Sequence, residues 1–299
     1  MGKISVVINT LNEEKDLKRA LESVKWADEI VVCDMHSTDQ TVEIAKKYGA
    51  KVFLHDFVDF VEPARNFAIS KATGDWILIL DPDEEIPTTL AERLQEIANT
   101  TDSPNYILIP RKNIIFNKWV QASMWWPDYN IRFFQKGDVS WSDKIHRPPK
   151  VKGVSFLLGE RKEFAITHYH YQTISQFLRR MDRYTNVQAR ELIENGYKFS
   201  WKDLIEKPLS EFLSRFFANK GFQDGLHGLA LSFLQAFSFL ILYLKVWEQE
   251  GFKEKELQWD EIKNIQKQSG KEIDYWVKHG NLSSNPAKAF LQKLRNKLD

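Results

Sequence analysis

Residues 75–85 read DWILILDPDEE, an apolar run that ends in four carboxylates. A short, uninterrupted apolar stretch such as 75–80 is typical of a strand that is buried on both faces. The carboxylates of 81–85 repel one another, and a divalent cation held by hard oxygen ligands relieves that repulsion. The alternative is that they form the first turn of the next helix, where the helix dipole favours negative charge. Their place directly after a buried strand favours a metal site, and we expect Mg²⁺ or Mn²⁺ there.

The sequence before this segment repeats a strand-then-helix pattern. Three β-branched or apolar runs are predicted to be strands: ISVVI at 4–8, EIVVC at 29–33 and AKVFL at 50–54. Helices are predicted to follow a cap at Asn12, to span 41–48 and to begin at Pro63, with Gly49 and Gly74 ending the last two. Four strands alternating with three helices predict an α/β fold with a mostly parallel, doubly wound sheet.

Polar side chains follow these strands, at the edge of the sheet where ligands of such folds bind. After the first strand the sequence is NTLNEE, which lacks the glycines that would cradle a phosphate group. Its carboxylates repel phosphate, so Thr10, Leu11 and Glu13 suit a neutral base or a ribose. Asp34, after the second strand, can accept a hydrogen bond from a pyrimidine imide. Arg65, near the start of the third helix, forms either a surface salt bridge or a contact with a nucleotide.

The second half of the chain has a different pattern. Residues 106–170 contain short aromatic and β-branched segments broken by Pro and Gly, which predict hairpins in a β-rich lobe on the acceptor side of a cleft. From residue 174 onward the pattern is helical. We therefore expect a catalytic α/β domain at 1–172 and a C-terminal α-helical extension at 173–299.

One segment of the extension, Leu229–Leu244, is almost entirely apolar. It has about sixteen residues, against the roughly twenty that a membrane-spanning helix needs. Three interpretations remain open, because a buried core helix, a helix at a dimer interface and an interfacial membrane helix all need the same apolar stripe. The expected partners of the extension are thus a second copy of the chain or a membrane surface.

Composition narrows the class of protein. The 299 residues carry 42 Lys and Arg against 41 Asp and Glu, a net charge of +1, so no overall field attracts nucleic acid. The single cysteine, Cys33, allows no internal disulfide and fits a reducing compartment. The apolar run at the N-terminus is too brief for a secretory signal. A cytoplasmic location, including the cytoplasmic face of the inner membrane, is the expectation.

Four motifs in order, NTLNEE, DMHSTDQT, PARNFA and DWILILDPDEE, resemble those of the family 2 glycosyltransferases of GT-A fold. Later segments, among them PDYNIRFF, KIHRPP and THYHYQT, resemble the branch with lipopolysaccharide-core glucosyl- and heptosyltransferases. The resemblance implies that Asp34 and Arg65 contact the nucleotide base, that Asp81 lies by the ribose and the metal, and that Asp83 coordinates the metal. The Gln-x-x-Arg-Trp signature of processive synthases is absent from the sequence, which favours single sugar additions.

The implied reaction is an inverting transfer from a nucleotide sugar, UDP-linked by expectation, to a glycan or glycolipid acceptor. It needs a side chain that takes the proton of the acceptor hydroxyl, while the metal stabilises the diphosphate leaving group. The candidates for this base are Asp128, Asp143 and His146, with Asp128 favoured. One of His146, His168 and His170 is expected to complete the metal shell, with His146 preferred, although such histidines are more often partly buried residues held by hydrogen bonds. Trp125, Trp126 and Trp141 are candidates for stacking on a sugar, although aromatic residues of a β-rich region more often belong to the core.

Two other functions are compatible with a related sheet. A sugar-1-phosphate nucleotidyltransferase should carry a glycine-rich loop after the first strand, and NTLNEE is not such a loop. A non-catalytic nucleotide-sugar-binding scaffold would keep the binding residues and recruit partners through its helices. The acidic pair Asp81 and Asp83, together with a base candidate, argues against the scaffold.

Overall fold

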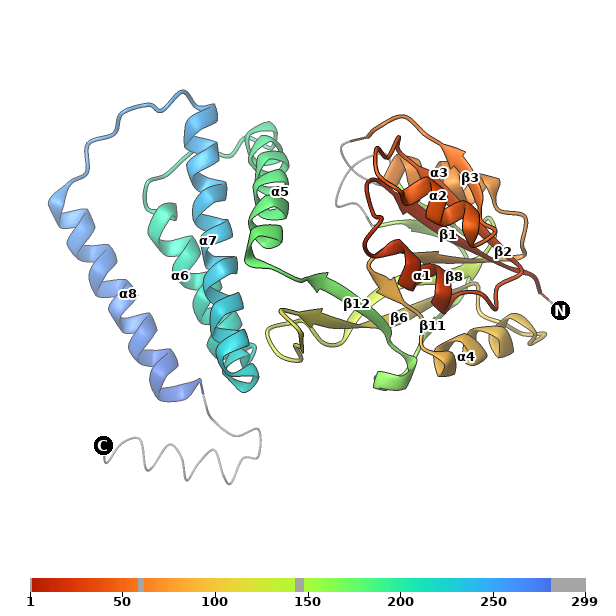
Figure 1. The fold of residues 1–299 in the computed structure, drawn as a ribbon. Coiled ribbons are helices and arrows are strands. Elements are labelled where there is room, and N and C mark those ends of the chain that lie inside the picture. The colour runs from red at the N-terminus through yellow and green to blue at the C-terminus, as the bar shows by residue number, and fades with distance from the viewer. Residues whose placement is uncertain (1, 59–61, 143–147, 281–299) are drawn as a thin grey trace, which may run out of the picture. The chain divides into compact units, whose positions relative to one another are not determined.

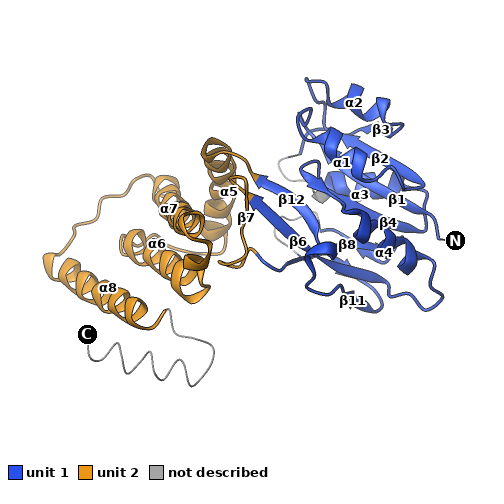
Figure 2. Ribbon diagram, turned by 60° about the horizontal axis from the view of Figure 1, so that its bottom comes forward, with its two compact units in different colours: residues 1–114, 126–170 blue, residues 115–125, 171–299 orange. Residues whose placement is uncertain are grey.

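The computed structural model describes residues 2–58, 62–142 and 148–280. The chain divides into two compact units (Figure 2). Unit 1 consists of residues 1–114 and 126–170, and unit 2 of residues 115–125 and 171–299. The short segment 115–125 thus interrupts unit 1 in the sequence but belongs to unit 2.

The first half of unit 1 contains the four predicted strands, which are confirmed. They are β1 (Ile4–Thr10), β2 (Glu29–Asp34), β3 (Lys51–Leu54) and β4 (Trp76–Leu80), paired in parallel in the order β3-β2-β1-β4. Between them run α1 (Leu17–Ser23), α2 (Thr41–Lys47) and α3 (Glu62–Lys71) (Figure 1). Both β1 and β4 are buried along their whole length, as their uninterrupted apolar sequences predict.

Helices cover both faces of this sheet. On one face, side chains of β1 and β4 share a core with α1, α2 and α4 (Thr88–Ala98). On the other face the same two strands pack with α3, whose Ala64 and Ala68 are fully buried. The doubly wound α/β arrangement predicted from the sequence is therefore confirmed, and it brings the carboxyl ends of β1, β2 and β4 to one edge.

The second half of unit 1 is rich in strands, but they extend the same sheet instead of forming separate hairpins in a lobe. The order continues from β4 through β8 (Asp128–Gln135), β6 (Tyr106–Ile115) and β12 (Ile166–Tyr171) to β5 (Glu84–Glu85). The pairs β4–β8, β8–β6 and β12–β5 are antiparallel. Because β8 occupies the edge that β4 would otherwise leave unpaired, polar residues of the second half come next to the acidic segment after β4. The remaining strands of the described chain are short: β7 (Lys118–Trp119), β9 (Val139–Ser140), β10 (Lys150–Val151) and β11 (Ser155–Leu157).

Two local predictions about helix ends are wrong. Asn12 does not cap α1, which begins five residues later; Asn12 has a left-handed backbone (φ 56°), and its side-chain oxygen accepts a hydrogen bond from the Thr38 backbone N–H (2.8 Å). Gly74 does not end α3, which stops at Lys71. A Cβ at Gly74 would lie 2.7 Å from the backbone oxygen of Lys3, so close approach of two segments requires this glycine.

Unit 2 is helical, as predicted. Its main helices are α5 (Ile174–Glu194), α6 (Asp203–Leu213), α7 (Leu226–Gln249) and α8 (Trp259–His279). At 24 residues, α7 is longer than the apolar stretch suggested, and its length and composition would allow it to cross a membrane. One third (33%) of its most apolar stretch is buried among other helices, and core helices of soluble proteins meet the same criteria.

Segment 115–125 is fastened to the turn before α7. The Asp224 carboxylate accepts hydrogen bonds from the backbone N–H groups of Gln121 (3.0 Å) and Ala122 (2.7 Å). The Ser123 N–H donates to the carbonyl of Asn219 (2.8 Å). A Cβ at Gly221 would lie 2.5 Å from Ser123 Oγ, so only glycine lets the turn come this close.

Candidate active site

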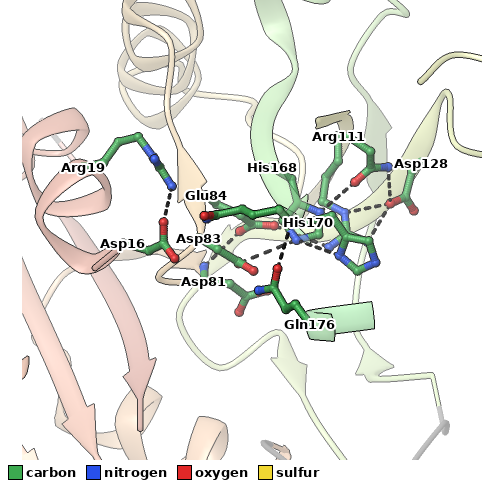
Figure 3. A network of polar contacts seen from close by, with 12 residues as sticks. Asp16, Arg19, Asp81, Asp83, Glu84, Arg111, Asp128, His168, His170 and Gln176 are labelled. Atoms are coloured by element: carbon green, nitrogen blue, oxygen red, sulfur yellow. Dashed lines mark hydrogen bonds and ion pairs between the residues drawn. The ribbon is translucent and has the colours of Figure 1, made fainter. Parts of the chain in front are cut away.

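The acidic segment after β4 forms a tight turn and then a strand (Figure 3). The Asp81 N–H donates to Glu84 Oε2 (2.9 Å), and the Glu84 N–H donates to the Asp81 carbonyl (3.0 Å). Glu84 and Glu85 form β5, and α4 begins only at Thr88. The interpretation that these carboxylates make up the first turn of a helix is therefore wrong.

Three arginines from different elements meet this turn. Arg132 of β8 places Nη2 2.5 Å from Asp81 Oδ2 and 2.8 Å from Glu84 Oε1. Arg65 of α3 lies 3.3 Å from Asp81 Oδ1, and Arg111 of β6 lies 3.4 Å from Glu84 Oε1. Glu84 is fully buried and Arg132 is 5% exposed, so each charge depends on its partners for compensation.

These pairs decide the protonation of the buried groups. Burial alone would raise the pKa of Asp81, but the charges of Arg132 and Arg65 outweigh it and hold that pKa well below its usual range. Burial would lower the pKa of Arg132, whereas the charges of Asp81 and Glu84 raise it above its usual value. At neutral pH both members of the pair are ionised.

Asp128 opens β8, and its carboxylate is oriented by three side chains. Oδ2 accepts hydrogen bonds from Arg111 Nε (2.9 Å), Arg111 Nη2 (2.6 Å) and Asn113 Nδ2 (3.2 Å), while Oδ1 accepts one from Asn130 Nδ2 (3.1 Å). Burial alone would raise the pKa of Asp128. The Arg111 charge and the hydrogen bonds lower it by more than burial raises it, so the pKa lies below its usual value. The side chain is 27% exposed, so this oriented carboxylate remains open to an incoming hydroxyl.

Asp83 and His168 form the part of the site that suits a metal. His168 Nε2 lies 3.6 Å from Asp83 Oδ1, and His170 Nδ1 lies 3.2 Å from His168 Nε2 (Figure 3). Two neighbouring ligands of an octahedral ion with bonds of about 2.1 Å lie roughly 3 Å apart, so this carboxylate oxygen and imidazole nitrogen would move about 0.6 Å closer on holding a divalent cation together. Within residues 2–58, 62–142 and 148–280 no three acidic, His or Cys side chains are grouped to hold a metal. A divalent cation held by Asp83 and His168 would therefore need its other ligands from substrate phosphates and water.

The loops after β1 and β2 are joined by Asp34. Its carboxylate is fully buried and accepts hydrogen bonds from Thr10 Oγ1 (2.8 Å), Ser37 N (2.8 Å) and Ser37 Oγ (2.6 Å). Leu11 and Glu13 follow on the same loop and are half-buried. Asp34 therefore orders the two loops that border this edge of the sheet.

Trp141 lies beside Arg65 because the next residue of α3, Asn66, holds its backbone in place. Trp141 N donates a hydrogen bond to Asn66 Oδ1 (2.9 Å), and Asn66 Nδ2 donates one to the Trp141 carbonyl (2.8 Å). The indole lies 5.3 Å from the Arg65 guanidinium and 5.7 Å from the Phe134 ring. Trp141 thus supports Arg65 and packs on the core, which leaves its predicted stacking on a sugar without support here.

The structure brings together four of the ten site residues expected from the sequence: Arg65, Asp81, Asp83 and Asp128. Arg65 contacts Asp81, which Arg132, Glu84 and Arg111 connect to Asp128. Asp83 is connected to Asp128 through His168 and Asn113. Two other candidates, Asp143 and His146, lie outside the described residues.

Sequence reasoning missed Arg111 and Asn113, and it gave no separate role to Glu84 or Arg132. It named His168 among the histidines that could complete a metal shell but preferred His146. A signal was present, because Arg111 and Asn113, like Asp128, Asn130 and Arg132, alternate along strands of otherwise apolar sequence. Residues two apart share one face of a strand, so both sets line the same side of the sheet.

The sequence is similar to those of known proteins. The model of the family "Glycosyl transferase family 2" matches residues 5–150. An uncharacterized glycosyltransferase of Rickettsia typhi is 33% identical over 258 residues, which cover 83% of this chain and 88% of the relative. The chain belongs to glycosyltransferase family 2. The enzymes of this family transfer a sugar from a nucleotide sugar.

This glycosyltransferase is also similar to the lipopolysaccharide core biosynthesis glycosyltransferase LpsC of Rhizobium meliloti, at 23% identity over 84% of this chain and 94% of that protein. Among solved structures, TarS 1–349 of S. aureus aligns with a TM-score of 0.43 and 16% identity, over 81% of this chain and 91% of that chain.

Proposed function

We propose that this family 2 glycosyltransferase is a metal-dependent, inverting enzyme that adds single sugars from a UDP-sugar to a glycan or glycolipid acceptor such as lipopolysaccharide core. One observation carries the proposal: Asp83 with His168, and the oriented carboxylate of Asp128, lie in one polar network at the carboxyl edge of the sheet. The similarity to LpsC supports the class of acceptor. The family assignment decides against a sugar-1-phosphate nucleotidyltransferase.

The donor side is assigned to the edge formed by β1, β2 and α3. The base lies against the loops that Asp34 orders, with Thr10, Leu11 and Glu13 bordering it. Arg65 reaches the nucleotide from α3 while its other contact, Asp81, lies toward the ribose. A neutral base suits these loops because they present carboxylates and no glycine-rich phosphate cradle.

The chemistry requires a proton acceptor and a stabilised leaving group. Asp128 accepts the proton of the acceptor hydroxyl as that oxygen attacks the anomeric carbon, and the bond to the diphosphate breaks with inversion. Asp83 and His168 would hold Mg²⁺ or Mn²⁺, which supplies positive charge to the diphosphate. Arg111 and Asn113 keep the Asp128 carboxylate turned in one direction.

A thermal-shift experiment tests this function with matched variants of the acidic segment. Ligands that bind the native state raise its unfolding temperature. We expect UDP-glucose with Mn²⁺ to raise the Tm more than UDP-glucose alone, and Asp83→Asn to abolish the Mn²⁺-dependent part. Glu85→Gln is the control, because Glu85 accepts a hydrogen bond from the Tyr169 hydroxyl (2.9 Å) and has no assigned metal role. An equal Mn²⁺ response in Asp83→Asn and the wild type would refute the metal assignment.

The scaffold alternative is tested in the same preparation. A scaffold binds the UDP-sugar but neither hydrolyses it nor transfers its sugar. Release of UDP, measured with Mn²⁺ and with or without lipopolysaccharide core oligosaccharide, separates the two functions. We expect release that depends on Asp128, and no UDP release under any condition would favour the scaffold.

We further propose that unit 2 contacts the cytoplasmic face of a membrane through α7. Three large apolar side chains of this helix, Leu226, Phe233 and Phe237, are 78%, 57% and 42% exposed. Their spacing of seven and four residues places them on one side of the helix. Interfacial helices bind membranes through such a stripe.

Co-sedimentation with liposomes of anionic lipid tests the membrane contact. We expect Phe233→Ser/Phe237→Ser to lose binding and Trp259→Ser, which changes an aromatic side chain on α8 that is even more exposed (68%), to retain it. Sedimentation equilibrium covers the other occupant, a second copy of the chain. A dimer that dissociates in the double variant, with unchanged liposome binding, would assign this stripe to self-association.

A further inference from the structure

We propose that Asn113 is a positioning residue that fixes the tautomer of His168 and links the metal side of the site to Asp128. Asn113 lies on β6 and is 1% exposed. Its Oδ1 is 2.7 Å from His168 Nδ1, and its Nδ2 is 3.2 Å from Asp128 Oδ2. The inference rests on the proposed function, since it concerns how this chain presents His168 to a divalent cation.

The orientation of the Asn113 amide follows from Asp128. The Asp128 carboxylate is paired with Arg111 (2.6 Å) and can only accept hydrogen bonds. The amide must therefore turn its NH₂ group toward Asp128, which leaves its oxygen facing His168. An amide oxygen only accepts, so the proton of the neutral imidazole resides on Nδ1.

This tautomer leaves the lone pair of His168 on Nε2. Nε2 lies 3.6 Å from Asp83 Oδ1 and 3.2 Å from His170 Nδ1, so without a cation its lone pair accepts a hydrogen bond from the His170 Nδ1–H, and a cation shared with Asp83 would replace that hydrogen bond. An imidazole lone pair and a carboxylate oxygen repel each other, and a cation between them reverses that repulsion. Metal-binding histidines commonly donate their second N–H to an oxygen acceptor, which fixes the ring and raises its basicity. Asn113 provides that acceptor.

Two substitutions at position 113 separate this role from simple filling of a buried polar site. Asn113→Leu removes the hydrogen bonds of this side chain to His168 and Asp128. Asn113→Asp keeps the acceptor for His168 but replaces the donor to Asp128 with a second carboxylate. Asn130→Leu is the matched control, because Asn130 donates to Asp128 Oδ1 (3.1 Å), on the oxygen away from Asn113.

Mn²⁺ binding provides the readout, measured by the electron paramagnetic resonance signal of free Mn²⁺ in the presence of UDP. Loss of such an outer contact typically costs about 10–100-fold in metal affinity, which is the loss expected for Asn113→Leu. The Mn²⁺ affinity of Asn130→Leu should stay within about twofold of the wild type, because this variant keeps the hydrogen bond between His168 Nδ1 and Asn113 Oδ1. Asn113→Asp should bind Mn²⁺ within about threefold, while its rate of UDP release falls by about 100-fold because Asp128 is disturbed.

Circular dichroism establishes that each variant is folded before the titration. Wild-type affinity in Asn113→Leu, or an equal loss in Asn113→Leu and Asn130→Leu, would overturn the inference and leave the proposed function standing. If Asn113→Leu does not fold, a tenfold loss of Mn²⁺ affinity in Asn113→Asp would overturn it instead. A wild-type protein that binds no Mn²⁺ with UDP would overturn the proposed metal dependence together with the inference.

Discussion

Arg132 Nη2 lies 2.5 Å from Asp81 Oδ2, in a pair that joins β8 to the turn after its neighbour β4. With Arg65 and Arg111, this arginine relieves the repulsion among the carboxylates of the acidic segment. The arginines thus compensate most of the carboxylate repulsion that led us to expect a metal from the sequence. In the structure, the argument for a cation depends on a single pair of facing side chains, Asp83 and His168.

Removing the Arg132 charge should destabilise the fold. Arg132→Met leaves the fully buried Glu84 and the partly buried Asp81 without their main partner, and breaking a buried pair costs about 3–5 kcal/mol. The control is Arg93→Met, which breaks an exposed pair with Glu96 and should cost less than about 1 kcal/mol. Urea unfolding at pH 7 measures both, and similar small losses in the two variants would contradict this account.

The pH dependence of activity should report Asp128. A base works when ionised, and the lowered pKa of Asp128 keeps it ionised until the pH falls below the usual range of aspartate, about 4. Activity should therefore stay flat from pH 8 down to about 5. Arg111→Met removes the main lowering influence and leaves burial, so the acid limb of kcat/KM should move to higher pH. An acid limb that stays in place would argue against Asp128 as the base.

Asp128→Asn should lower kcat by about 10²–10⁴-fold with unchanged affinity for UDP.

Glu29 should stabilise the fold without serving catalysis. It lies at the start of β2, and its carboxylate accepts hydrogen bonds from Ser5 Oγ (2.5 Å), Thr73 N (2.6 Å) and Lys51 Nζ (2.7 Å). Burial raises its pKa, but these partners outweigh burial and lower the pKa from 4.5 to about 2.

The sign of the Glu29 effect follows from that shift. A lowered folded pKa stabilises the protein above the unfolded value of 4.5, and this contribution is lost as the pH falls toward 2. Glu29→Gln should therefore cost about 3 kcal/mol at pH 7 and less at pH 3, measured by urea unfolding. UDP release at 20 °C should be unchanged. A cost that is the same at both pH values would contradict the assigned partners.

Cys33 should be inert toward thiol reagents in the folded protein. The residue is fully buried in β2, and burial, with the nearby charge of Asp34, raises the pKa of its thiol to about 11. The reactive thiolate is therefore scarce at pH 8. Labelling with a disulfide reagent should be complete in 6 M guanidinium and negligible in native buffer. Rapid labelling of the native protein would show that β2 opens.

The sequence predicted correctly those features of the fold that depend on residues close together in the chain. The strands β1 to β4 follow from local apolar runs, and Asp81 and Asp83 follow from their place after β4. The pairing of β4 with β8 depends on residues more than fifty positions apart, such as Ile77 and Phe134, and no local pattern specifies it. The network of Arg132 with Asp81 and Glu84 follows from that pairing and could not be predicted without it.

Helix ends show the same limit. Asn12 and Gly74 have the residue types of a cap and a stop, but both serve contacts with distant segments, at Thr38 and Lys3. Asp83 was predicted as a metal ligand from its place in the acidic segment after a buried strand and from the family resemblance. Its facing residue, His168, is brought near by β12 pairing with β5 across 84 positions of sequence.

The segment 115–125 makes the two units of the chain hard to separate genetically. A nonsense mutation or a protease cut after residue 171 would spare every strand of the sheet, yet it would remove Asp224, Asn219 and Gly221, which hold this segment. The released backbone N–H groups would then be left at the surface of the fragment, in a loop that leads directly to Asp128 in the sequence. The helices are therefore not a tail that can be lost or exchanged on their own. Recombination that swaps them between relatives should succeed only when residues 115–125 are exchanged with them.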